Sequence, residues 1–329
     1  MINEVYNTVL SVLNKNNYGY LSPADFNLFA TQAQLSLFED FFYDYNNQIN
    51  KENIRQSGTG YADIKSGIEQ DISIFAATQI LNQPVFYLDT ANIYELPSDY
   101  YFINKLYYYP NLLFSGVTSA QAGYKLIDAT LSQFIPTGVG VVASPPNGSI
   151  VVNTSPAGPP AAPLLSAYVN AVDSTSQLSI SGDIMAVGQN YKIYDATNIV
   201  EVEKVSQHKI FNLTSSNLTA PTTTYPAYVL SEGATTEIAT IYPSTINQKG
   251  AVMCQYIRYP RTPKWTYVMV NNAPQFNASA NDYQDFEIPA DSKVDVIAKI
   301  LQYSGVSIRE IEVYKFGQNE EQLDNQKES

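Results

Sequence analysis

An uninterrupted helical pattern near the start constrains this chain more than any other feature. From Pro23 to about residue 50 there is no glycine and no further proline. Ser22 precedes this stretch as a helix N-cap, Pro23 suits the first helical position, and Asp25 places negative charge in the first turn. The pattern predicts a helix about 40 Å long. Its apolar face repeats at helical spacing through Phe26, Ala30, Ala33, Leu37 and Phe41.

Helical patterns also lie at both ends of the chain. A short helix is expected before the turn at 16–19, with Val5, Val9, Val12 and Leu13 on one face. After Pro289, Asp291 or Ser292 caps a second helix that Gly305 closes, and Ser307-x-x-Glu310 caps a further short segment. The inner face of the helix after Pro289 is expected to comprise Val294, Ile297, Ala298 and Leu301. The 23–50 helix and the 291–302 helix are expected to pack on each other or on a neighbouring subunit, because each has an apolar face too large to expose.

The hydrophobic period changes to that of strands after Pro84. Runs dense in aromatic and β-branched residues, bounded by prolines and turns, predict strands at 85–88, 100–109, 200–205, 228–230, 237–242 and 253–259. The expected class is therefore α+β, with N-terminal and C-terminal helices packed together around a central, mainly antiparallel β domain. The predicted divisions are a helical segment 1–83, a β domain of 84–117 and 200–288, an insertion 118–199, and C-terminal helices with a polar tail, 289–329.

The insertion differs in composition from its surroundings. Pro145-Pro146-Asn147-Gly148 and the proline-rich stretch 156–160 read as loops on either side of a short apolar run. A β-rich or irregular segment that projects from the molecule is expected, rather than one that builds the core. On this interpretation a short Gly-Ser linker could replace 137–163 without loss of the fold.

The charge balance bears on the choice of partners. The formal net charge is −13, from 31 acidic and 18 basic residues, and no basic stripe interrupts it. A phosphate backbone would be repelled by such a surface, so nucleic acid is not expected as a ligand. A pore built from many copies would still pass DNA, and negative walls would let it slide.

Few features of the sequence indicate the cellular compartment of the chain. The first residues, Met1-Ile2-Asn3-Glu4, do not resemble a signal peptide, and no run of 18 apolar residues predicts a membrane span. Cys254 is the only cysteine, which excludes an intramolecular disulfide framework and a multi-cysteine zinc site. The chain is expected in a cytoplasm, or in a particle assembled there.

A search for catalytic chemistry identifies no catalytic, cofactor-binding or metal-binding residues. His208, the only histidine, reads as a surface or packed residue at a strand end. Asp282, Asp285 and Glu287 lack the spacing of a calcium loop, which favours a helix-capping or loop-fixing role. A glycosidase needs two carboxylates across a cleft, and the many acidic residues single out no pair. A tail-fibre or carbohydrate-binding module stays open as an alternative, and an acidic glycoside hydrolase as a less favoured one.

A resemblance to a known family lies in the sequences of six segments: 1–48, 95–100, 202–209, 256–265, 280–287 and 299–310. These segments resemble the structural proteins of crAss-like short-tailed phages that infect gut Bacteroides-type bacteria. The resemblance does not extend to 118–199. It implies a non-enzymatic ring or head–tail connector protein, located in the phage neck or tail and assembled in the cytoplasm of the host bacterium. It also implies a dodecameric homo-oligomeric ring that contacts the portal protein and other tail or ring proteins, with DNA only as cargo in the lumen.

A ring subunit needs surfaces that grip its neighbours. Phe41 on the long helix and the tyrosines Tyr107, Tyr108 and Tyr109 are candidates, because tyrosine suits interfaces and half-buried sites. The polar tail after Phe316 is expected to dock on a partner, with Phe316 and Leu323 as its apolar contacts.

Overall fold

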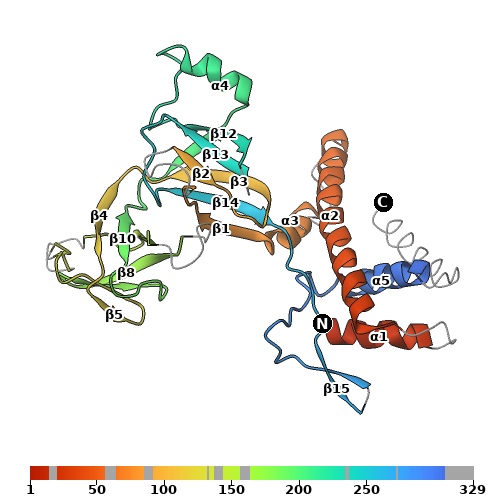
Figure 1. Cartoon of the computed structure of the whole chain (residues 1–329). Helices are drawn as coiled ribbons and strands as arrows, with labels where there is room; N and C mark the ends of the chain where they lie inside the picture. The colour runs from red at the N-terminus through yellow and green to blue at the C-terminus, as the bar shows by residue number, and fades with distance from the viewer. Residues whose placement is uncertain are drawn as a thin grey trace. The chain divides into compact units, whose positions relative to one another are not determined.

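The computed structural model describes residues 1–14, 21–55, 64–84, 92–131, 133–136, 144–155, 164–233, 237–271 and 273–307. It confirms a mixed α and β fold, with five helices and two seven-stranded sheets in these ranges (Figure 1). The chain divides into two compact units. Unit 1 comprises Met1–Phe75 with Tyr259–Ser329, and unit 2 comprises Ala76–Arg258.

Unit 1 is built mainly from helices. Its elements are α1 (Ile2–Asn14), α2 (Pro23–Arg55), α3 (Ile64–Ser73), α5 (Lys293–Ser307) and a hairpin of β15 (Tyr267–Val270) and β16 (Ala273–Phe276). The predicted cap of α2 is confirmed, because the Asp25 N–H donates to Ser22 Oγ at 3.1 Å. Both α1 and α2 pack against α5 (Figure 1). Their shared core contains Val5, Val9, Phe26, Ala30, Val296 and Ile300, each fully buried.

The predicted inner face of α5 is confirmed at Ala298 and Leu301, which are buried, and Ile297 packs against the same core. Val294 does not belong to this face, because it is 59% exposed, whereas Val296 and Ile300 are fully buried. Gly305 lies inside α5 and does not end it. The buried apolar positions of α5 therefore begin at Val296 and not at Val294.

The segment from Tyr259 to Ile288 belongs to the helical unit and not to the β domain. Trp265, Phe286 and Ile288 are buried in the core that α1, α2 and α5 share. Acidic side chains hold this segment in place, as the sequence predicted. Asp285 accepts the Met1 ammonium at 2.8 Å and the Ile2 N–H at 2.7 Å. Glu287 Oε2 accepts the Arg261 N–H at 2.8 Å.

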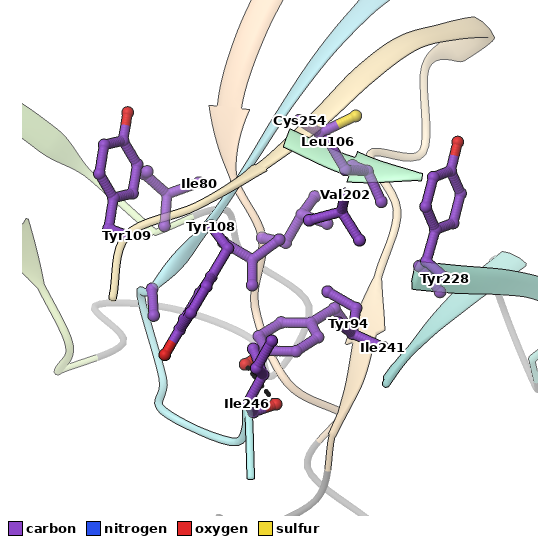
Figure 2. Packing of buried hydrophobic residues seen from close by; sticks show 14 of the residues in the cluster. Ile80, Tyr94, Leu106, Tyr108, Tyr109, Val202, Tyr228, Ile241, Ile246 and Cys254 are labelled. Atoms are coloured by element: carbon purple, nitrogen blue, oxygen red, sulfur yellow. Dashed lines mark hydrogen bonds between the residues drawn. The ribbon is translucent and has the colours of Figure 1, made fainter. Parts of the chain in front are cut away.

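The first sheet of unit 2 follows the predicted strands closely. Its order is β1-β14-β3-β11-β12-β13-β2, antiparallel throughout except for the parallel pair β11–β12. The strands are β1 (Ala76–Ile80), β2 (Ile93–Glu95), β3 (Tyr100–Tyr108), β11 (Val200–Lys204), β12 (Ala227–Glu232), β13 (Glu237–Tyr242) and β14 (Val252–Arg258). Figure 2 shows the core on this sheet, where Leu106, Tyr108 and Cys254 are buried together with Tyr94 and Ile246. Burial raises the pKa of the Cys254 thiol to about 12.

The second sheet contains the segment that the sequence predicted as an insertion. Its order is β4-β10-β7-β8-β9-β6-β5. The strands are β4 (Leu112–Val117), β5 (Ala120–Ala122), β6 (Lys125–Ile127), β7 (Ile150–Asn153), β8 (Ser166–Ser174), β9 (Gln177–Ile180) and β10 (Asn190–Tyr194). The sheet therefore begins at Leu112 and not at 118.

The expectation that 137–163 lies outside the core is wrong. Strand β7 runs between β10 and β8, and all four of its residues are buried. Successive side chains of a strand point to opposite faces. Ile150 and Val152 accordingly enter the core of the first sheet, whereas Val151 enters a separate core with Leu126 and Ile193. A Gly-Ser linker in place of 137–163 would remove a strand that serves both cores.

One further sequence expectation needs correction, and four others lie outside the described residues. His208 is exposed in the short helix α4 (Gln207–Thr214) and not at a strand end, because Ile210 and Leu213 pack at helical spacing onto Val205 and Val229. The strand predicted at 85–88, the turn at 16–19, the capped segment after 307, and the tail with Phe316 and Leu323 lie outside the described residues.

Candidate interaction surfaces

The aromatic residues selected from the sequence fall in different environments. Phe41 lies in α2 and is half-buried, and Phe38 beside it is fully buried instead, edge-on to Phe75 at 4.9 Å. Tyr107 is half-buried in β3. Tyr108 and Tyr109 are core residues, exposed by only 6% and 1%. The Tyr109 hydroxyl contacts Met253 Sδ at 3.4 Å. These two tyrosines are thus closed to a partner, which corrects their assignment as interaction residues.

The hairpin of β15 and β16 exposes more apolar surface to solvent than the aromatic residues selected from the sequence. All four residues of β15 are exposed: Tyr267 by 45%, Val268 by 50%, Met269 by 58% and Val270 by 40%. The hairpin forms a sheet of two strands, to which no further strand in the described ranges is paired. Sequence reasoning missed it, although a strand-like apolar run before Asn271 is the usual signal of a hairpin.

A second apolar surface lies in unit 2, on the excursion that carries α4 between β11 and β12. Figure 1 shows α4 at the outer end of this excursion, beyond β12 and β13. Phe211 is 68% exposed, Leu218 is 94% exposed and Tyr225 is 80% exposed. The surrounding residues are mostly Ser, Thr and Asn, and 210–231 contains no charged residue. We call 207–226 the α4 excursion.

A groove of about 510 Å³ runs between α1 and the hairpin within unit 1. Trp265 is one of its lining residues, although it is only 2% exposed, and its ring stacks on Tyr6 at 4.0 Å and on Tyr267 at 5.7 Å between ring centroids. The Trp265 Nε1–H donates to Asn3 Oδ1 at 3.1 Å. The remaining lining residues combine amides with apolar groups: Asn7, Leu10, Pro274, Gln275 and Phe276.

No protein-family model matches this sequence, and no curated protein is similar to it.

In the ranges given above, no three His, Cys, Asp or Glu side chains gather in a way that could hold a metal ion. In the same ranges, no helix is both long and apolar enough to cross a bilayer. Large apolar groups are instead exposed together on the hairpin and on the α4 excursion. Exposed apolar side chains that cluster in this way are candidate contact sites for another macromolecule.

Proposed function

We propose that this chain is a structural subunit of a tailed-phage virion, one copy in a ring that joins the portal to the tail. The observation that supports this proposal is the exposure of apolar side chains on each unit, on the hairpin in unit 1 and on the α4 excursion in unit 2. A ring subunit must contact neighbours on more than one side. The resemblance of 256–265 and 280–287 to crAss-like phage ring proteins supports the same function.

The charge of the chain fits a genome conduit. With a net charge of −13 per copy, a ring of identical copies is acidic as a whole, and we infer that the walls of its lumen are acidic too. Such walls repel the phosphate backbone, so DNA would pass as cargo without being held. The portal protein and the other tail proteins are then the partners of the outer surfaces, and the particle is the site of action.

Mass photometry of the purified chain, together with counting its copies in purified particles, tests this function. We expect closed rings of twelve copies of the 36.5 kDa chain, in solution or in the particle. Leu218→Asp should lower the fraction of chains in those rings, because it places charge on an almost fully exposed apolar side chain without touching the core. Val187→Asp, at an exposed valine outside the excursion, is the matched control. A chain that is absent from particles and stays single at all concentrations would contradict the proposal.

The groove beside Trp265 favours a second function, a carbohydrate-binding module. The half-buried Phe276 ring lies among the exposed amides of Asn7 and Gln275, which suits the apolar face and the hydroxyls of a sugar. None of the lining residues is acidic, so the groove does not offer the carboxylate pair that a glycoside hydrolase needs. If this function is correct, oligosaccharides should bind to the chain in calorimetric titrations. Asn7→Ala should weaken that binding. Asn46→Ala, an exposed helical asparagine away from the groove, is the control. An absence of heat with a broad oligosaccharide panel would remove this candidate.

A further inference from the structure

The hydrogen-bond pattern of the hairpin leaves one edge of β15 open. The register places Tyr267 opposite Phe276 and Met269 opposite Pro274. One step before them, the Asn277 N–H donates to the Thr266 carbonyl at 2.9 Å. Hydrogen-bonded and non-hydrogen-bonded pairs alternate along an antiparallel ladder. The N–H and C=O groups of Tyr267 and Met269 therefore point away from β16, toward the free edge of β15.

The two faces of the hairpin differ in the same alternation. Tyr267 and Phe276 lie on the face that stacks on Trp265, at 5.7 and 5.9 Å between ring centroids. Val268 and Val270 lie on the other face, exposed by 50% and 40%. An apolar strand with an open edge and an uncovered face is a template for another strand. Two strands alone are also marginally stable in water, and further strands stabilise them.

The opposite edge of the hairpin is blocked. Pro274 has no N–H, and its register position is one whose backbone groups face outward from β16. Proline in a sheet is confined to such edge positions, where it prevents a further strand from pairing. The hairpin can therefore be extended on the β15 side and not readily on the β16 side.

We propose that β15 pairs antiparallel with β15 of a second copy of this chain. The open edge is complementary to itself. With Val268 opposite Val268 of the second copy, the outward groups of Tyr267 meet those of Met269, and the outward groups of Met269 meet those of Tyr267. The product is a four-stranded sheet whose outer strands are both β16. Pro274 then blocks both outer edges, so the pairing closes at two copies.

The charge distribution supports a second copy as the occupant of this edge. Residues 265–281 contain no charged side chain, although the whole chain carries a net charge of −13. A basic partner would be selected by an acidic surface, and this hairpin offers none. Two identical acidic chains repel each other, so they meet at lowest cost where neither contributes charge.

The pairing is independent of the ring proposed above. It is an isologous contact that closes at two, whereas a ring of identical subunits needs a heterologous contact between different surfaces. A ring in which every hairpin is paired would contain twice the number of chains. The number of chains in the oligomer therefore tests the ring. A halving of the oligomer's mass when the hairpin is mutated tests the pairing.

The test is a charge exchange at Val268 in the full chain, followed by sedimentation equilibrium. Wild type is expected to form pairs. Val268→Glu and Val268→Lys, each alone, should raise the dissociation constant of the pair about a hundred-fold or more, because like charges then face each other. An equimolar mixture of the two variants should pair again, because opposite charges face each other across the contact.

Val187→Glu is the matched control, since this valine is 59% exposed and belongs to unit 2 and not to the unit that contains the hairpin, and it should pair as wild type does. Far-ultraviolet circular dichroism and the fluorescence of Trp265 establish that each variant is folded. Wild type that remains single, pairing that persists in both single variants, or a mixture that does not pair would each overturn the proposal. If a ring also forms, Val268→Glu should halve its mass, and an unchanged mass would overturn the pairing.

Discussion

Trp265→Ala is expected to lower the free energy of unfolding of unit 1 by about 3–5 kcal/mol. The indole is only 2% exposed, and it packs in the same core as α1, α2 and α5. Its ring stacks on Tyr6, on Tyr267 and on Phe276. Truncation would leave a cavity in this core and would also free the Asn3 side chain that accepts the indole N–H. The segment that joins the hairpin to the helices would lose its largest buried contact.

Urea unfolding followed by circular dichroism at 222 nm measures this effect, because four of the five described helices belong to unit 1. Trp265→Phe is the matched variant. It keeps an aromatic ring in the stack but loses the hydrogen bond to Asn3, and we expect it to cost about 1–2 kcal/mol. An unfolding midpoint for Trp265→Ala equal to that of wild type would show that the stack does not stabilise the unit.

Gly116→Ala is expected to destabilise unit 2 by about 2–4 kcal/mol, a large effect for the addition of one methyl group. A β-carbon at this position in β4 would overlap Asp128 Oδ2 and lie 2.8 Å from the Tyr191 hydroxyl. Asp128 cannot move aside freely. Its carboxylate accepts the Tyr191 hydroxyl at 2.9 Å and both the N–H and the hydroxyl of Thr130. Burial raises the pKa of Asp128, but these hydrogen bonds outweigh it and hold the pKa below its ordinary value.

The measurement is urea unfolding followed by the near-ultraviolet dichroism of the tyrosines, which are numerous in unit 2. The fluorescence of Trp265 reports on unit 1 in the same samples, and its transition should stay in place if the two units unfold separately. Gly123→Ala is the control, since a β-carbon there would have no atom within 4 Å and should change stability little. Equal losses in the two alanine variants would contradict the steric explanation.

The bounds of helices and strands were predicted well where residues close in the sequence determine them. Ser22 and Pro23 mark the start of α2, and the Asp25 N–H bonds to the Ser22 hydroxyl as a capping residue requires. The strand patterns at 237–242 and 253–259 likewise coincide with β13 and nearly with β14. Helix caps and the two-residue periodicity of strands depend only on residues close in the sequence. Both can therefore be recognised in a single sequence.

The assignment of segments to a core could not be predicted in the same way. Nothing near Trp265 indicates that its partner is Tyr6, at the other end of the chain. Strand β7 looks like a short apolar run between proline loops, and only its neighbours β8 and β10 make it central. The error at the hairpin is the reverse of that at β7. An apolar run such as Tyr267–Val270 is ordinarily expected to be buried, and here it is exposed.

The burial of Cys254 makes the chain a convenient object for chemical labelling. A thiol reacts through its thiolate, and a pKa of about 12 leaves almost none of it at neutral pH. A cysteine introduced on the hairpin or on the α4 excursion would thus be the only thiol that a maleimide reaches in the folded protein. Cys254 can stay in place during such mapping. Its own slow modification would then time how often the first sheet of unit 2 opens.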